Sequence, residues 1–440
     1  MPCLPLPFEL WLAILEPMAQ EVVTAKRSNR FIRPGYGALA SVCRHWQLIF
    51  EPKIFERLTL RAEDVQFINF AVRERRRHMV KHIWFIVEFN MYSPYNSELN
   101  RQDPLDNIPS YFFWNAISSL FLQLSLWDAP YARGDSGITL ELSMWSPSDN
   151  KYCFQDIDFG EGDCLDSFLD IEEDFLLHTV PLHAPAHGWA QGSRFRSATT
   201  MEWQKIRHFI QFWGDVEMFS VVAVTGLLLR RQTRTDLHHT AYQAICNKLP
   251  NLAQIHLEMW QEWEEPRIKD KTQELRILLA TAFPRTLERA TLLYDTTEAI
   301  RDEYDDELTD TLHKLRNELA YQLIHFSLSL KSFTCSFIST ADEFFDHYLY
   351  STHFYNRRLD ARQTEVAREM KWHYLQQFTM TSPSLQPGAH VSEITQLVYS
   401  AGLAALDMPF VRKFRLWHGG DDHASLLSFE VEADNCLRIH

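Results

Sequence analysis

Residues 252–257, Leu252-Ala253-Gln254-Ile255-His256-Leu257, decide the fold of this chain because their apolar residues stand at the first, fourth and sixth positions. The alternation at the end of this segment is typical of a short strand with one buried face. The same L-x-x-L-x-L pattern, with other apolar residues allowed, recurs along most of the chain. The matching positions are Val80, Ile83 and Phe85; Val224, Leu227 and Leu229; Leu287, Ala290 and Leu292; Leu330, Phe333 and Cys335; Leu375, Phe378 and Met380; and Val411, Phe414 and Leu416.

Several of these apolar segments follow a stretch with helical periodicity. Residues 237–248, 308–326 and 390–406 are such stretches, and each precedes one match of the pattern. A helix before each strand predicts parallel strands that are joined by helical connections. Together with the L-x-x-L-x-L signature, this organisation predicts an α/β fold, in which a leucine-rich-repeat-like solenoid carries a curved parallel sheet.

The spacing of the matches is longer and less even than in a regular repeat protein. From Leu229 to Leu416 the third positions of consecutive matches lie 28 to 45 residues apart, whereas regular leucine-rich repeats run about 20–29 residues. We therefore expect an irregular solenoid with long insertions, and a non-repetitive α/β domain is the alternative. Residues 86–200 are rich in Pro, Gly, Asp and Ser. They are expected to form an irregular insertion of long loops, with an extended piece at 138–144.

The first 60 residues have a different pattern, that of two short amphipathic helices. Residues 6–17 form the first expected helix, since Pro7 suits a first helical turn and the apolar residues recur at helical spacing. The second is expected from about Gly37 to Phe50, where Pro52 would end it. A long basic loop, residues 18–37, separates the two helices.

The N-terminal residues resemble the F-box family, because Leu6-Pro7-x-Glu9-Leu10 and Ala40-Ser41-Val42-Cys43-Arg44-x-Trp46 occur in the expected order. The rest of the chain resembles filamentous-fungal F-box proteins with degenerate leucine-rich-repeat-like C-terminal regions. That resemblance is carried by residues 80–85, 228–234, 283–287 and 401–409. It implies an F-box over residues 1–60 and a target-recognition domain over residues 61–440.

The resemblance implies a substrate-recognition subunit of a Skp–cullin–F-box type ubiquitin ligase. The F-box would bind a Skp-type adaptor and, through it, a cullin ligase, and the repeat region would bind an unknown target protein. The adaptor-facing or locally packed residues would be Leu6, Pro7, Leu10, Ile14, Leu15, Leu39, Val42, Cys43 and Trp46. The loop between the helices is longer than in a compact F-box, so a scaffold that has lost adaptor binding is an alternative.

A third hypothesis is an enzyme or a small-molecule-binding protein on the same scaffold, with a pocket near residues 145–200 and the turn at 418–423. No phosphate-binding loop, dinucleotide, hydrolase or zincin motif occurs in the sequence, so we expect neither a catalytic site nor a cofactor. The clusters that could carry chemistry have simpler interpretations as loops, turns and a helix start. They are Asp174 with His178, His183 and His187; residues 417–423; and the acidic residues 298–307.

Composition argues against several classes of partner. A net charge of -15 disfavours binding to nucleic acid or to anionic membranes, and the basic run at residues 73–78 is expected to be a solvated turn. The longest uncharged apolar stretch lies between Glu217 and Arg230, which is too short for a bilayer span of about 20 residues. Seven scattered cysteines without a CxxC motif predict no metal or disulfide site. We expect a protein of the cytoplasm or the nucleus.

Four tryptophans fall at or near the ends of the expected strands, and they are candidates for the target-binding surface. They are Trp260, Trp263, Trp372 and Trp417. Such residues either cap the core or line an exposed edge of the sheet, where aromatic side chains are good anchors for a partner. The sequence leaves both interpretations open.

Overall fold

The computed structural model describes most of the chain beyond its first 35 residues. The described residues are 36–89, 108–129, 136–146, 185, 188–190, 193–196, 209–214, 216–231, 233, 235–261, 265–295, 306–354, 370–420, 423–431 and 437–439. The first predicted N-terminal helix, with Leu6, Pro7, Leu10, Ile14 and Leu15, lies outside these residues, as does Trp263.

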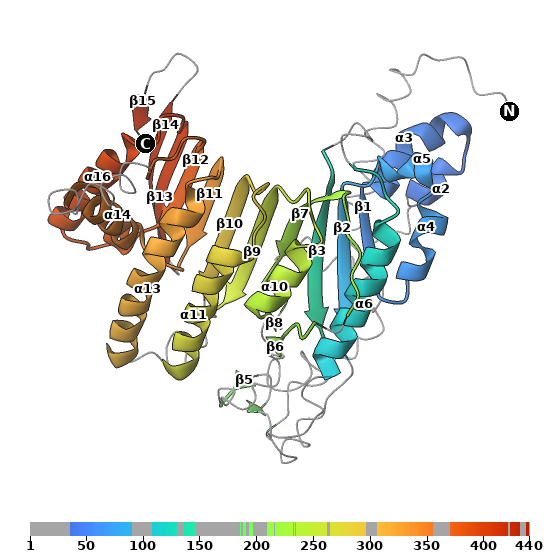
Figure 1. Ribbon diagram of the computed structural model, residues 1–440, viewed down its shortest axis with the longest axis horizontal. Coiled ribbons are helices and arrows are strands. Elements are labelled where there is room, and N and C mark those ends of the chain that lie inside the picture. Colours follow the sequence, from blue (N-terminus) through green and yellow to red (C-terminus); the bar gives the residue numbers. More distant parts are fainter. Residues whose placement is uncertain are drawn as a thin grey trace.

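The frame of the fold is an open, 11-stranded sheet whose strands stand side by side in chain order (Figure 1). Its strands are β1 (Arg57–Arg61), β2 (His82–Glu88), β3 (Ile138–Trp145), β7 (Val224–Leu229), β9 (Gln254–Trp260), β10 (Arg289–Asp295), β11 (Ser332–Ser336), β12 (Gln377–Thr381), β13 (Lys413–Gly420), β14 (His423–Val431) and β15 (Leu437–Ile439). Neighbours from β1 to β13 pair in parallel, and β14 and β15 continue the sheet antiparallel. The predicted α/β class is confirmed.

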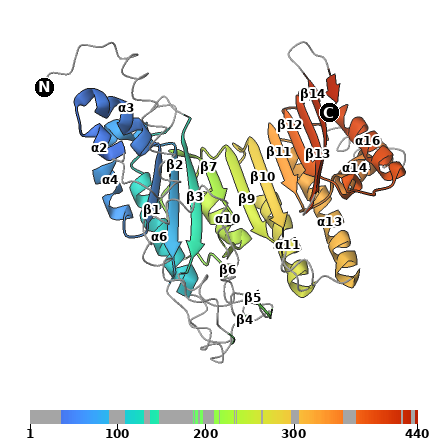
Figure 2. The same cartoon turned by 180° about the vertical axis from the view of Figure 1, so that it is seen from behind.

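Helices connect the parallel strands and cover one face of the sheet, as the front and back views show (Figures 1 and 2). The covering helices are α6 (Ile108–Leu124), α10 (His239–Cys246), α11 (Glu265–Thr281), α13 (Asp306–Ser327), α14 (Ala341–Leu349) and α16 (Val391–Ala405). From α10 to α16, each helix contacts the next. The opposite side of the sheet is called the helix-free face below.

Shorter elements complete the fold. At the β1 end of the sheet lie α2 (Tyr36–Ala40), α3 (Arg44–Phe55), α4 (Ile68–Ala71) and α5 (Glu74–Arg77). Two small sheets pair β4 (Trp189–Ala190) with β5 (Ser193–Arg194) and β6 (Phe209–Ile210) with β8 (Asp236–Leu237). Single helical turns occupy Val65–Phe67, Tyr350–Phe354 and Pro383–Leu385.

The apolar positions of the repeated pattern stand in register across the sheet. The sixth-position row runs through Leu60, Phe85, Leu142, Leu229, Leu257, Leu292, Cys335, Met380 and Leu416. Side chains alternate between the faces of a strand, so the fourth and sixth positions point to the same side. On that side they join the helices in one hydrophobic core. Each match of the pattern therefore forms an equivalent strand.

The backbone that enters the strands repeats as well. The N–H groups of Lys81 and His82 both donate to the carbonyl of Glu56, the residue before β1. The same paired donation recurs at four later positions: to Ala253 from Glu288 and Arg289, to Glu288 from Lys331 and Ser332, to Lys331 from Gln376 and Gln377, and to Gln376 from Arg412 and Lys413. Successive units thus share a local hydrogen-bond pattern and not only a sequence pattern.

The prediction that residues 86–200 form an insertion of long loops is wrong in one respect, because the extended piece within them belongs to the main sheet. Residues 138–144 lie in β3, between β2 and β7. The first position of the pattern is Gly137 here, and its φ of 86° is one that glycine adopts readily. Without an apolar residue at that position, the L-x-x-L-x-L signature is hidden. The helix α6 was also not predicted.

The second N-terminal helix begins and ends differently from the prediction. Instead of one helix from 37 to 50, α2 ends at Ala40 and α3 begins at Arg44. The helix α3 then continues through Pro52 to Phe55, so the prediction that Pro52 ends it is wrong. Proline lacks one backbone donor, and α3 continues for only three residues beyond it.

Candidate functional site

The helices α2 and α3 pack as a small module at the β1 end of the sheet (Figure 1). The residues Leu39, Ile49 and Phe50 form a hydrophobic cluster of their own, separate from the core beneath the sheet. The rings of Tyr36 and Trp46 each lie 5.9 Å from the ring of Phe50. The helix pair therefore has a small core of its own, while Phe55 at the end of α3 packs against the main core.

The predicted adaptor-binding residues divide into two groups. Leu39 is buried inside the module, and Cys43 and Trp46 are half-buried. Val42 is 61% exposed, and Leu48, which was not predicted, is 59% exposed. The break between α2 and α3 changes the helical phase, so the apolar face expected for one continuous helix does not identify Leu48. The two exposed side chains are the apolar surface that the described part of the module offers to a partner.

An ion-pair network fastens this module to the adjoining chain. The carboxylate of Glu51 in α3 is buried and lies 2.6 Å from Arg76 and 3.2 Å from Arg75. The Arg76 guanidinium also stacks over the ring of Phe55, at 4.8 Å from its centroid. A buried carboxylate is tolerated only when cations and hydrogen bonds surround it. We call Glu51, Arg75 and Arg76 the arginine clamp.

The arginine clamp corrects the expectation that residues 73–78 are a solvated turn. Glu74–Arg77 form the helix α5, with Arg73 and His78 as its flanking residues, and the arginines of the helix have specific partners. Arg77 donates to the carbonyl of Leu126 at 2.8 Å, and its guanidinium lies over the ring of Trp127. The basic run therefore joins α3 on one side and the end of α6 on the other.

The helix-free face carries a charged network on its first strands. Glu141 of β3 has no solvent exposure, and its carboxylate lies 2.6 Å from His82, 3.3 Å from Arg230 and 3.6 Å from Arg57. Trp84 stands opposite Glu141 in the register, and its indole N–H donates to Ser143 at 2.8 Å. Cationic and aromatic side chains thus gather on this face around one buried carboxylate.

A second charged pair lies on β9 of the same face. His256 Nε2 is 2.6 Å from Glu258 Oε1, and the backbone N–H of Arg231 donates to Glu258 at 2.9 Å. Burial alone would raise the pKa of Glu258, but these hydrogen bonds and the nearby charges of His256 and Arg230 outweigh it, so the pKa lies below its ordinary value. Glu258 is therefore ionised at neutral pH.

The tryptophans predicted as a target surface have different positions. Trp372 is fully buried and donates to Ser327 at 2.8 Å, and Trp260 is 5% exposed and lies beneath the guanidinium of Arg231. Trp372 is therefore part of the core. Trp260 lies outside the core cluster and donates to the carbonyl of Thr233 at 2.9 Å, so its ring is covered by β7 and the residues after it. Trp417 is half-buried on β13, where its ring meets Phe337 edge-on at 5.6 Å.

The other clusters show no chemistry in the part of the chain that is described. Asp174, His178, His183 and His187 lie outside it, as do residues 298–305. His418 and His423 stack at 5.3 Å across the β13–β14 hairpin, and the predicted C-terminal strand at 425–431 falls in β14. Within the described ranges, no three His, Cys, Asp or Glu side chains are placed to hold a metal ion.

Two cysteines of the described residues are buried without a disulfide bond. Cys246 and Cys335 are buried, and burial raises the pKa of each thiol to about 12. A thiol with so high a pKa stays protonated and behaves as a small apolar residue.

No helix among the described residues is both long enough and apolar enough to span a membrane.

The described part of the chain contains a cavity of about 480 Å³ at the amino ends of β3, β7, β9 and β10. This is not the place expected for a ligand pocket, near residues 145–200 and the 418–423 turn. The sequence could not reveal the cavity, because its lining residues come from five separate segments between Lys81 and Arg289.

Comparisons with known proteins give one match. Residues 282–440 match a family described as a family of unknown function (DUF6546). This segment contains the sheet from β10 to β15 with the helices α13, α14 and α16. Neither an F-box nor a leucine-rich-repeat family matches. A search of curated proteins and a search of solved structures find no match to the chain.

Proposed function

We propose that this chain is the substrate-recognition subunit of a Skp–cullin–F-box type ubiquitin ligase. In this proposal the N-terminal 60 residues bind a Skp-type adaptor, and the helix-free face of the sheet binds the protein to be ubiquitylated. The sheet and its helices act as an irregular leucine-rich-repeat-like solenoid. The in-register apolar rows and the repeated backbone hydrogen bonds support that description.

One observation carries the proposal. The segment Ala40–Trp46, which resembles the second half of an F-box, lies on a helix pair with its own core and with Val42 and Leu48 exposed. Small helical modules that expose apolar side chains are typical of partners that insert a helix into a hydrophobic groove. The arginine clamp ties α3 of this module to α5, and Arg77 of α5 donates in turn to the chain that follows α6. A ligase receptor needs such a fixed geometry to present its target.

The helix-free face suits the recognition of a protein. Its charged pairs, Glu141 with His82 and Glu258 with His256, are fixed in place by several contacts each. Charged and aromatic groups in fixed positions give a protein surface its specificity for one partner.

Binding of a purified Skp-type adaptor to the full chain tests the proposal. Replacing Val42 and Leu48 together by aspartate is expected to weaken binding by about 100-fold or more, because two charges would enter an apolar interface. Leu406→Asp is the matched control, since Leu406 is 78% exposed at the end of α16, and this helix lies at the opposite end of the sheet from α2 and α3. Isothermal titration calorimetry measures the affinity, and circular dichroism checks that each variant is folded.

Two outcomes would contradict the proposal. One is that the intact, folded chain does not bind the adaptor at all. The other is that Leu406→Asp weakens binding as much as the double variant, which would show that any added charge at an exposed apolar position has this effect.

A further inference from the structure

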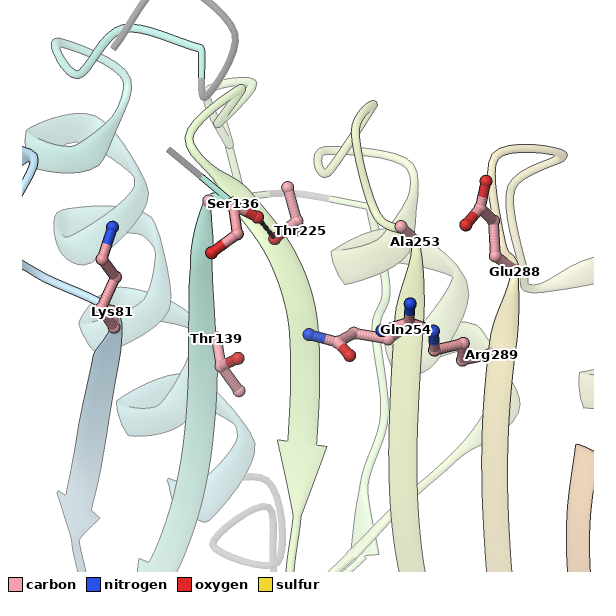
Figure 3. A pocket seen from close by; sticks show the side chains of 9 residues that line it. Lys81, Ser136, Thr139, Thr225, Ala253, Gln254, Glu288 and Arg289 are labelled. Atoms are coloured by element: carbon pink, nitrogen blue, oxygen red, sulfur yellow. Dashed lines mark hydrogen bonds between the residues drawn. The ribbon is translucent and has the colours of Figure 1, made fainter. Parts of the chain in front are cut away.

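The cavity at the amino ends of the central strands has a polar lining (Figure 3). It opens on the helix-free side, and its volume of about 480 Å³ is in the usual range of small-ligand sites. The lining residues come from successive units of the repeat: Lys81, Ser136, Gly137, Thr139, Thr225, Ala253, Gln254, Glu288 and Arg289.

The cavity lies where the repeat is interrupted. Ile138 pairs with Val224 and Thr139 pairs with Gly226, which leaves Thr225 as an additional residue in β7. The hydroxyl of Thr225 donates to the carbonyl of Ser136 at 3.0 Å, and this bond links β7 to the residues just before β3. Such β-bulges are frequent beside binding sites, because they re-aim side chains and open the sheet locally.

Gly226, next to the additional residue of the bulge, leaves space at the base of the cavity. A Cβ atom at Gly226 would lie 2.9 Å from Thr139 Oγ1 and 3.0 Å from Gln254 Nε2. Because no Cβ is present, the side chain of Gln254 extends across β7 toward Thr139, as Figure 3 shows. The amide and the hydroxyl therefore share one side of the cavity.

The charges of the lining favour an anion. Lys81 and Arg289 are cations, and the carboxylate of Glu288 is bound to Lys331 Nζ at 2.6 Å. Arg289 is exposed, so its guanidinium is accessible from the cavity. Arg289 pairs with Gln254 in the register of β9 and β10, so an accessible cation stands beside the Gln254 amide in the cavity.

We infer that this cavity binds a carboxylate-bearing ligand. The planar guanidinium of Arg289 matches a carboxylate through two parallel hydrogen bonds. The Gln254 amide on β9 and the Thr139 hydroxyl on β3 can donate to the same ligand. Lys81 precedes β2, four strands from Arg289, so its charge acts on a ligand that extends across the cavity. The site goes beyond the proposed function, since it does not require adaptor binding.

Titration of the full chain with citrate, and separately with a peptide of eight glutamates, tests this assignment at low ionic strength. Both probes carry carboxylates, and the tighter one identifies the source as a free small molecule or as an acidic protein segment. Arg289→Gln and Lys81→Gln are each expected to weaken binding by about 10-fold, as for the loss of one charge-assisted hydrogen bond. Glu288→Gln is expected to tighten it, because Lys331 loses its counter-ion and its positive charge then adds to the site.

Arg412→Gln is the matched control for these charge changes. Arg412 lies just before β13, so it stands at the amino ends of the strands, as the cavity does. The strands β11 and β12 separate β13 from the cavity. Its replacement is expected to leave both affinities unchanged. Gly226→Ala is expected to weaken binding without a change of charge, and its thermal melt reports whether it folds.

The assignment is overturned if the folded chain binds neither probe, if inorganic phosphate binds more tightly than citrate, or if Arg412→Gln weakens binding as much as Arg289→Gln. Adaptor binding is measured on the same variants. Loss of carboxylate binding with adaptor binding intact would contradict this inference alone, and the reverse result would contradict the proposed function alone.

Discussion

Phe378→Ala is expected to lower the free energy of unfolding by about 3–5 kcal/mol, the usual cost of removing a buried aromatic side chain. Phe378 of β12 is fully buried in the C-terminal half of the core. Its ring lies 4.9 Å from Phe414, 5.4 Å from Phe344 and 5.6 Å from Phe345, between centroids. Removing it leaves a cavity in the middle of an aromatic cluster, and rigid rings on all sides cannot collapse to fill it.

Urea unfolding followed by tryptophan fluorescence measures this loss. Phe410→Ala is the matched control because Phe410 is 59% exposed, and its replacement is expected to change stability by less than about 0.5 kcal/mol. Equal effects of the two variants would contradict the position of Phe378 in the core.

Loss of the arginine clamp is expected to have an effect of similar size, confined to the N-terminal module. Replacing Arg75 and Arg76 together by glutamine leaves the carboxylate of Glu51, which is 3% exposed, without its cations. Breaking a buried ion pair by removing one side costs about 3–5 kcal/mol. We expect α3 to lose protection against hydrogen exchange while the strands β9 to β13 keep theirs.

A compensating change tests the reason for that loss. Adding Glu51→Leu to the double arginine variant removes the buried charge as well, and replacement of a buried ion pair by apolar groups is often neutral. Protection of α3 is therefore expected to recover in the triple variant. If it does not recover, the arginines stabilise α3 through packing, such as the contact of Arg76 with Phe55, and not through Glu51.

The sheet could be predicted from the sequence to the extent that each strand carries the complete apolar pattern. The positions Leu252, Ile255 and Leu257 identify β9, and the equivalent residues identify β2, β7 and β10 to β13. The strand β3 was missed as a member of the sheet because Gly137 replaces the first apolar residue. The register shift at Thr225 arises from pairing between strands that are far apart in the sequence, so no local pattern could reveal it.

The candidate sites were predicted less completely, because they depend on contacts between units. Val42 was identified from helical spacing, but Leu48 was not, since the break after Ala40 shifts the helical phase. Arg75 and Arg76 have their roles because Glu51 is buried. The sequence does not indicate this burial, because a glutamate in a short helix is usually exposed. The cavity could have been anticipated only by aligning the units, in which Thr139, Gly226, Gln254 and Arg289 occupy one register row.

Affinity capture of the full chain from a cell extract, followed by quantitative mass spectrometry, tests the receptor proposal most directly. The intact chain is compared with Leu10→Asp and Trp46→Asp, one in each half of the F-box-like segment, and with Leu406→Asp as the control. We predict that a Skp-type adaptor and a cullin are recovered with the intact chain and with Leu406→Asp. Both should be lost from the other two variants. Recovery of neither protein with the intact, folded chain would contradict the proposal.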